Sequence, residues 1–311
     1  MEPPERVSGG FDFWVYGLHF GGPGLPAPWA EPLIARIPAV AARYPSLEQE
    51  TRMLSWVAAQ GYPAPPMLEL MPPGELFDSP VQVMRRLAGI TMAQAMTSAP
   101  WQAARWARRL AAAHVALHRL PVPDWAGRSV AEQRLGLTRR MVARDPDSGL
   151  AKALERVEPI LPRLDVDSPT VCHGDFHPAN LLVEAGTAAA GTVAAIDWTD
   201  AGIGDRHGDI ARTAWLFGFA AVVARSGMER LVLRALAPPL SRTYLSAYRC
   251  ELPVDPVRLR LWMPLNLLHA WAVAVAGEQG FFGPSGRGSQ FSAELADWAE
   301  RQFRLCLEDL P

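Results

Sequence analysis

The sequence has 311 residues, of which 49% are apolar and 20% charged, so the chain can bury a core and is not expected to be disordered. Its 30 Lys and Arg residues nearly balance 32 Asp and Glu residues, and the formal charge of -2 argues against nucleic acid as a partner. Lys152 is the one lysine, and Asn180 and Asn266 are the two asparagines. Any role that needs either residue type therefore has few candidates.

The N-terminal part is predicted to be rich in strands. Residues 7–20 alternate aromatic and small residues, which is typical of a strand, and this run opens near a pair of glycines. A turn rich in Gly and Pro follows over residues 21–32, and residues 33–37 predict a short strand that ends at a proline. Residues 81–84 predict a further strand, followed by a turn at residues 88–89.

A helix is predicted between these strands. Ser46 is a candidate N-cap with Gln49 as its capping-box partner, and Gly61 and Pro63 mark the end of the helix. Glu50 lies in the middle of an apolar arc formed by Leu47, Met53, Leu54 and Val57. Because burial of an unpaired charge is very costly, Glu50 either meets a buried partner or reaches solvent near the helix start.

The remainder of the chain is predicted to be mainly helical. Residues 101–120 form an amphipathic helix whose His114 and His118 are four positions apart. No third metal ligand lies nearby in the sequence, so packed or surface histidines are the preferred interpretation. From His207 onward the pattern is mostly helical, with tryptophan-rich apolar stripes that suit a core. The sequence thus predicts an α+β chain with a small β-rich part and a larger helical part.

The sequence does not predict export or a membrane span. The first residues, MEPPER, have neither a basic n-region nor an apolar h-region, so we expect no signal peptide. The longest uncharged stretch in the C-terminal half, residues 261–277, is short and contains polar residues, which argues against a transmembrane helix. Cys172, Cys250 and Cys306 are odd in number and lack metal spacing, so we expect reduced thiols in a cytoplasmic protein.

Residues 170–212 carry the polar groups that suggest chemistry. Apolar runs at residues 181–183 and 193–196 predict a hairpin, which would bring Asp175, Asn180 and Asp197 to one end. Two carboxylates and an amide oxygen suit Mg²⁺ better than zinc. The spacing H-x-D-x-x-x-x-N, which protein kinases use in phosphoryl transfer, matches His173, Asp175 and Asn180. A capped turn with solvated side chains is the structural alternative.

This segment resembles the aminoglycoside phosphotransferase and choline kinase superfamily, whose members share the two-lobed protein-kinase-like fold. Residues 173–180 (HGDFHPAN) are similar to the catalytic loop of that family, and residues 196–198 (IDW) to its metal-binding motif. Residues 204–211 (GDRHGDIA) resemble the segment that follows. The resemblance implies a nucleotide-binding lobe over residues 1–86 and a catalytic, acceptor-binding lobe over residues 87–311.

The resemblance also implies roles for single residues. Asp175 is expected to be the catalytic base or to orient the substrate hydroxyl, and Asn180 and Asp197 are expected to hold Mg²⁺. Asp209 is expected to brace the catalytic loop, with His173 as a further structural support.

The nucleotide, ATP or GTP, is expected to bind mainly to backbone groups. Ser8, Gly9 and Gly10 are similar to the phosphate-covering turn of the family. The base is expected near Met84 to Arg86, at the hinge between the lobes. Contacts of this kind do not distinguish adenine from guanine.

An arginine is expected to replace the lysine that grips the nucleotide phosphates in protein kinases. Lys152 lies outside the N-terminal part, whereas Arg36 is placed in the third-strand position. Glu50 is the expected helix partner of this cation, and Arg36 would explain how Glu50 can face inward. Arginine is larger than lysine and binds phosphate through two donors.

The acceptor is expected to be a small hydroxylated molecule. Residues 210–280 contain four acids and eight arginines, which argues modestly against a polycationic aminoglycoside. Residues 196–201 (IDWTDA) resemble the macrolide phosphotransferase version of the motif, and four aromatic residues allow an apolar acceptor: Trp215, Phe217, Trp262 and Trp271. Residues 277–288 form either a lid or, as preferred, a surface loop.

Three functional hypotheses follow for this sequence. The preferred one is a small-molecule O-phosphotransferase that inactivates an antibiotic or another natural product. A housekeeping kinase for a choline-like or homoserine-like metabolite is the first alternative. A catalytically silent kinase-like binding protein is the second, and the departure at Arg36 is the feature that invites it.

Overall fold

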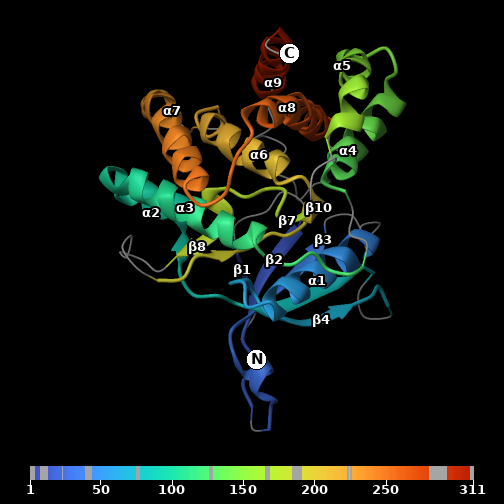
Figure 1. Cartoon of the computed structure of the whole chain (residues 1–311). Helices are drawn as coiled ribbons and strands as arrows, with labels where there is room; N and C mark the ends of the chain where they lie inside the picture. Colours follow the sequence, from blue (N-terminus) through green and yellow to red (C-terminus); the bar gives the residue numbers. More distant parts are fainter. Residues whose placement is uncertain are drawn as a thin grey trace.

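The computed structural model joins an N-terminal antiparallel sheet to a mostly helical C-terminal part (Figure 1). It describes residues 4–7, 13–22, 24–38, 44–74, 78–125, 129–164, 169–183, 191–222, 224, 226–279 and 293–308. The predicted α+β class is confirmed.

The N-terminal sheet has five strands in the order β1-β2-β3-β5-β4. Their bounds are β1 Glu5–Arg6, β2 Phe13–Leu18, β3 Leu33–Pro38, β4 Met67–Met71 and β5 Val81–Arg85. The predictions for β3 and β5 are confirmed. The run predicted over residues 7–20 is shorter, because the strand ends at Leu18 before the glycine-rich turn. The sequence pattern missed β4, which is only partly buried and carries an irregularity in its pairing with β5.

Helix α1 (Tyr44–Ala59) lies beside this sheet in Figure 1. It begins two residues before Ser46, so the prediction of Ser46 as the N-cap is wrong. The end is as expected, since Gly61 follows with a left-handed φ of 81°. The apolar arc is buried against neighbouring elements, with no more than 2% exposure at Leu47, Met53, Leu54 and Val57.

The C-terminal part contains most of the helices and two small sheets. Its helices are α2 Met92–Ser98, α3 Ala103–His118, α4 Val130–Arg144, α5 Gly149–Val157, α6 Arg206–Phe219, α7 Gly227–Arg249, α8 Pro256–Glu278 and α9 Ala293–Glu308. Short 3-10 helices within the described residues are Ala27–Ala30, Pro100–Gln102, Glu158–Arg163 and Pro178–Asn180. One small sheet pairs β7 (Thr170–Cys172) with β10 (Gly202–Gly204), and the other contains β6 (Ile90–Thr91), β8 (Leu181–Val183) and β9 (Ala194–Ala195).

The predicted hairpin is present in the second small sheet. Strands β8 and β9 are antiparallel, with Leu181 opposite Ala195. The backbone N–H of Ile196 donates to the carbonyl oxygen of Asn180 at 2.9 Å. This pairing holds Asn180 and Asp197 at the same end of the hairpin, which is the arrangement that the sequence predicted.

Helix α8 is the one helix of the described chain that is long and apolar enough to cross a membrane by length and composition. Its 23 residues exceed the uncharged stretch over residues 261–277, because residues 256–260 and residue 278 extend the helix. Within its most apolar window, however, 67% of the residues are buried inside the protein. Trp262, Leu265 and Leu268 belong to a core shared with α4, α5 and α9, so α8 is the central helix of this core.

Candidate active site

A large cleft lies between the N-terminal sheet and the helical part, with a volume of about 2410 Å³. Its lining includes Arg36 and Glu50 from the first part and Asp175, Asn180 and Asp197 from the second. The structure therefore brings together charged residues that are up to 161 positions apart.

Arg36 and Glu50 form a buried ion pair at the base of this cleft. Arg36 is 8% exposed and Glu50 4%, so the alternative in which Glu50 reaches solvent is wrong. The same Nη1 atom of Arg36 donates to Oε1 of Gln82 at 2.9 Å. Burial raises the pKa of Glu50, while the Arg36 guanidinium opposes this rise. The contact explains how a carboxylate can occupy the apolar face of α1.

The second amino group of Arg36 connects the sheet to the hairpin. Its Nη2 atom donates to Oδ1 of Asp197 at 3.0 Å and to the hydroxyl oxygen of Thr199 at 3.2 Å. The guanidinium also lies over the ring of Phe13, 4.1 Å from its centroid. Asp197 has a φ of 63°, a left-handed conformation that is uncommon outside glycine and often marks functional sites. No motif indicated Gln82, and Thr199 lies within residues 196–201 but had no role assigned to it there.

Asp175 is held by hydrogen-bonding partners on both carboxylate oxygens. Nε and Nη2 of Arg212 donate to Oδ1 at 3.0 and 2.8 Å. Nε2 of His177 and Nδ2 of Asn180 each lie 3.1 Å from Oδ2. Burial raises the pKa of Asp175, but the charges and hydrogen bonds of Arg212 and His177 outweigh burial and hold it well below 3.8. Asp175 is therefore an anion at neutral pH.

Asn180 and Asp197 offer oxygen atoms to the cleft. The amide nitrogen of Asn180 donates to the carbonyl oxygen and to the carboxylate of Asp175, at 3.0 and 3.1 Å. Its Oδ1 has no hydrogen-bond partner within the described part of the chain, and the Asp197 side chain is 40% exposed. An amide oxygen and a carboxylate facing a cleft fit Mg²⁺, which prefers oxygen ligands.

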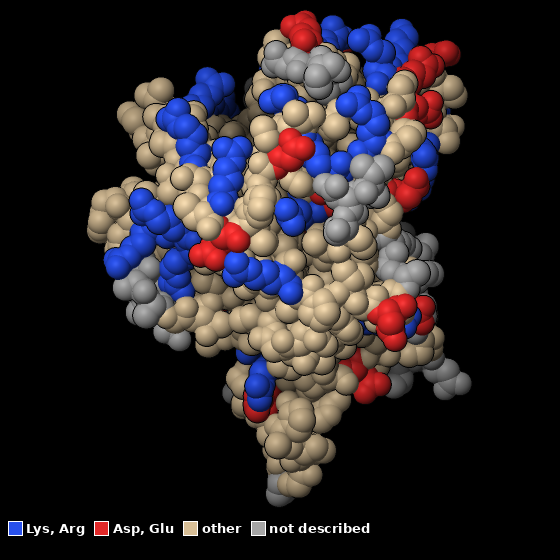
Figure 2. Space-filling model, viewed as in Figure 1, with Lys and Arg blue, Asp and Glu red and all other residues tan. Residues whose placement is uncertain are grey.

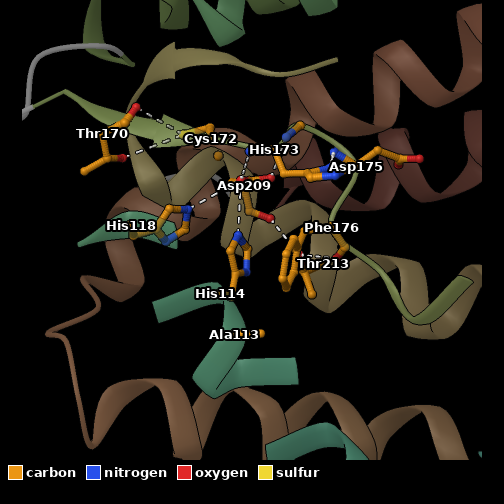
Figure 3. A network of polar contacts seen from close by, with 12 residues as sticks. Ala113, His114, His118, Thr170, Cys172, His173, Asp175, Phe176, Asp209 and Thr213 are labelled. Atoms are coloured by element: carbon orange, nitrogen blue, oxygen red, sulfur yellow. Dashed lines mark hydrogen bonds and ion pairs between the residues drawn. The ribbon is translucent and has the colours of Figure 1, made fainter. Parts of the chain in front are cut away.

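Asp209 of α6 lies at the centre of a buried polar network (Figure 3). Its Oδ2 accepts the backbone N–H of His173 at 2.7 Å, and its Oδ1 accepts that of Gly174 at 3.0 Å. Nε2 of His114 lies 3.1 Å from Oδ2 and Nε2 of His118 lies 3.4 Å from it. Asp209 therefore fixes the backbone of the two residues that precede Asp175.

The preferred interpretation of the histidine pair of α3 as packed side chains is confirmed, because His114 and His118 are both buried in this network. The fold supplies a third potential metal ligand, Asp209, and the three ligand atoms lie within 4.8 Å of one another. The other ring nitrogens lie 2.8 Å from the hydroxyl of Tyr244 for His114 and 2.7 Å from that of Tyr248 for His118. Because each ring uses both nitrogens and the carboxylate also accepts two backbone N–H groups, the geometry is that of a hydrogen-bond network. Burial lowers both histidine pKa values, that of His118 to about 4, so both rings are neutral at pH 7.

Gly174 is required by the shape of the loop. Its φ of 80° lies in the left-handed region, and an added Cβ would stand 2.1 Å from the carbonyl oxygen of Asp200. A nitrogen of Arg134 donates to the carbonyl oxygen of Gly174. Arg134 is 2% exposed, and burial, assisted by the charge of Arg212, lowers its pKa to about 10. Arg134 is a loop contact that no sequence motif indicated.

Several predicted residues have a different or undescribed placement. Ser8, Gly9 and Gly10 lie outside the described residues, as do residues 280–288 of the proposed lid. Met84 is buried and lines the cleft. The backbone N–H of Arg86 donates to the carbonyl oxygen of Pro32 at 2.8 Å. That N–H is thus already used by the fold.

The sheet, the helical part and the cleft between them define a kinase-like phosphotransferase. A family model described as the phosphotransferase enzyme family matches residues 5–261. The match covers more than half of the chain, so the chain belongs to this family of phosphotransferases, and the predicted enzyme class is confirmed.

Individual relatives agree with this assignment. The chain is 31% identical over 223 residues to an aminoglycoside 3'-phosphotransferase of Streptomyces fradiae, a match that covers 68% of this chain and 77% of the relative. It is also similar in fold to the crystal structure of aminoglycoside phosphotransferase APH(4)-Ia, with a TM-score of 0.65, 17% identity and coverage of 98% and 93% of the two chains. A third similar structure is APH(3'')-Id from Streptomyces rimosus in complex with ADP and streptomycin, with a TM-score of 0.59, 21% identity and coverage of 86% and 92%.

Proposed function

We propose that this enzyme transfers the γ-phosphate of a Mg-nucleotide to a hydroxyl of an antibiotic or another weakly charged natural product. The observation that carries the proposal is the convergence of Asp175, Asn180 and Asp197 in one cleft with Arg36. Phosphoryl transfer mainly requires positioning and charge neutralisation, and this set of groups can provide both.

Asp175 is the proposed hydroxyl-orienting residue. It is anionic at neutral pH, so it can accept a hydrogen bond from the acceptor hydroxyl. The depressed pKa makes it a weak base, which suits a loose transition state in which orientation matters more than early proton removal. Arg212 and His177 hold the carboxylate still while the hydroxyl binds.

Asn180 and Asp197 are the residues that would hold Mg²⁺, through Oδ1 of the amide and through the carboxylate. When bound, the ion neutralises charge on the nucleotide phosphates. Arg36 is the proposed phosphate-binding cation, because its guanidinium lies beside Asp197 at the base of the cleft.

ATP is the proposed nucleotide, with GTP as the tested alternative. The structure of one relative contains ADP, which supports an adenine nucleotide. The base is proposed to lie at the hinge over Met84, which lines the cleft together with Leu87. Within the described backbone the N–H of Leu87 has no partner, whereas that of Arg86 is used by Pro32, so Leu87 is the better donor to a base.

The acceptor is proposed to be weakly charged. Glu132 lines the cleft but pairs with Arg139 at 2.9 Å, and Asp200 lies within the electrostatic reach of Arg134 and Arg212. On the face shown in Figure 2, Lys and Arg side chains cover more of the helical part than Asp and Glu side chains. An acid-rich surface suited to a polycation is not seen on that face. Aminoglycosides stay in the test panel because the relatives named above carry that name.

The boundary between the lobes and the location of the enzyme are also proposed. The lobe boundary is proposed between residues 86 and 87, and the location is proposed to be cytoplasmic.

A metabolite kinase and a catalytically silent binding protein are the competing functions. The ion pair of Arg36 with Glu50 speaks against the silent protein, because the arginine preserves the contact expected of a nucleotide-gripping cation.

The proposed function is tested by an acceptor screen that detects the mass of one added phosphate. Macrolides, nucleoside antibiotics, aminoglycosides and choline-like metabolites are each incubated with Mg-ATP and with Mg-GTP. We expect a product with at least one weakly charged hydroxylated compound and none with the variant Asp175→Ala. Nucleotide binding without any product across the panel would favour the silent binding protein.

A further inference from the structure

Large apolar side chains gather on the exposed surface at the start of α7. Met228 is 72% exposed, Leu231 64% and Val232 45%. Met228 and Val232 line the active-site cleft, whereas Leu231 does not. Neighbouring exposed apolar residues of this kind are a common mark of a binding surface.

The exposed residues belong to a groove that is continuous with the catalytic residues. We define the α6–α7 groove by its apolar lining: Leu216, Ala220, Met228, Val232, Leu233 and Leu236. Helix α6 leads from the catalytic loop into it, because Arg212 of α6 binds Asp175. With a rise of 1.5 Å per residue, Leu216 lies about 6 Å and Ala220 about 12 Å beyond Arg212 along the helix axis.

Charge is nearly absent from this part of the cleft. Of the residues of α7 that line the cleft, Glu229 is the charged one, and the described cleft residues of α6 beyond Arg212 are all uncharged. The groove therefore favours an uncharged, hydrocarbon-rich ligand and disfavours a polycation, which would lose its hydration without gaining partners.

We propose that the α6–α7 groove binds the apolar body of the acceptor while its hydroxyl lies at Asp175. The inference rests on the proposed function and adds to it a substrate class. The acceptor is a hydroxylated compound whose uncharged hydrocarbon portion lies along α6, about 6–12 Å beyond Arg212 as the helix rise measures it. Met228 and Val232 are specificity-determining residues.

The groove is tested with the neutral apolar fluorophore N-phenyl-1-naphthylamine, whose emission rises in an apolar site. The full-length enzyme is titrated with saturating Mg-ADP and again without nucleotide. Val232→Asp and Met228→Asp place a charge in the groove, and Leu231→Asp is the matched control on the same exposed helix turn. Circular dichroism checks that all variants keep the helix content of the parent.

We expect the groove variants to weaken dye binding by about tenfold or more, because each introduces a charge into an apolar site. Leu231→Asp is expected to leave the affinity within about twofold of the parent, as is usual for surface changes. Absent binding to the parent enzyme, or equal effects of Val232→Asp and Leu231→Asp, would overturn the inference.

The two proposals fail in different ways. Calorimetric titration with Mg-ADP measures the nucleotide site independently of the dye. Loss of nucleotide binding in the parent enzyme contradicts the proposed function, whereas intact nucleotide binding without groove-dependent dye binding contradicts the groove alone.

Discussion

Arg212 binds Asp175 with two nitrogen atoms, Nε at 3.0 Å and Nη2 at 2.8 Å, and both donate to the same oxygen, Oδ1. Asp209 lies three positions before Arg212 on α6 and binds the backbone of His173 and Gly174. Residues three apart share one helix face. Helix α6 therefore fixes the loop that carries Asp175 at two points, once through its backbone and once through the carboxylate of Asp175.

Replacement of Arg212 by Gln should lower kcat by on the order of 10²-fold, because Asp175 loses the partner that orients it. Arg212→Lys keeps the charge but not the two-nitrogen contact, so its kcat should lie between those of the parent and the Gln variant. The KM for the nucleotide should change little, and steady-state kinetics separates the two constants. A kcat unchanged in both variants would contradict the orienting role.

Arg36→Lys should weaken nucleotide binding by about tenfold or more, since a single ammonium nitrogen cannot occupy both the position of Nη1, beside Glu50 and Gln82, and that of Nη2, beside Asp197. Titration with Mg-ATP measures the affinity. Arg304→Lys is the control, because Arg304 pairs with Glu300 on the surface of α9, neither residue lines the cleft, and such pairs contribute little. Equal nucleotide affinities of the two variants would contradict the proposal that Arg36 binds the nucleotide phosphates.

Gly174→Ala should destabilise the protein by more than about 2 kcal/mol, since the new Cβ meets the carbonyl oxygen of Asp200 at 2.1 Å in a left-handed backbone. Gly218→Ala is the matched control. Its Cβ would meet nothing within 4 Å, so helix propensity should stabilise it by about 0.5–1 kcal/mol. Urea unfolding gives both values, and two similar losses would contradict the steric explanation.

Tyr244→Phe should cost about 1–3 kcal/mol of stability, because the buried Nδ1 of His114 loses the hydroxyl at 2.8 Å. It should also lower kcat, since His114 and Asp209 position the catalytic loop. Tyr16→Phe serves as the control. Its side chain makes no hydrogen bond within the described part of the chain, and the change should stay within about 0.5 kcal/mol. A stability loss with an unchanged kcat would make the network purely structural.

The lowered pKa of Asp205 predicts that the free energy of unfolding decreases at acid pH. Burial raises its pKa, but hydrogen bonds from His207 and Trp262 outweigh burial and hold it at about 2, below the ordinary 3.8. Because the folded state binds the ionised carboxylate of Asp205 better than the unfolded state does, this group stabilises the fold above pH 3.8. The stabilisation is lost as the pH falls toward 2 and the carboxylate is protonated. Its size is about 2 kcal/mol.

Asp205→Asn should therefore flatten the stability curve between pH 4 and pH 2 relative to the parent, measured by urea unfolding at each pH. The variant should also be less stable at pH 7, because Arg258 loses the carboxylate at 2.8 Å. Parallel curves for the two proteins would contradict the assignment.

The sequence contained enough information for the local parts of the site. The spacing of Asp175 and Asn180 and the apolar runs of the hairpin predicted one cluster, and the pairing of β8 with β9 places them as expected. Glu50 in an apolar arc predicted a buried partner, and Arg36 is that partner. These inferences succeeded because strand alternation, helix periodicity and the cost of a buried charge act over short stretches of chain.

Contacts between distant elements were not predictable in the same way. No third metal ligand was found near His114 and His118 in the sequence, yet the fold brings Asp209, which lies 91 or more positions away, into contact with both rings. Arg212 and Arg134 belong to no motif, so nothing in a single sequence separates them from surface residues.

The amino-acid sequence by itself determined the fold class and predicted the segment that carries Asp175 and the pairing of Arg36 with Glu50, because rare residue types and local periodicity left few choices. Tertiary structure decided which side chains surround Asp175, which histidines share Asp209 and which exposed apolar residues face the cleft. Those features depend on how separate helices pack, and side-chain packing is a property of the whole core and of no single segment.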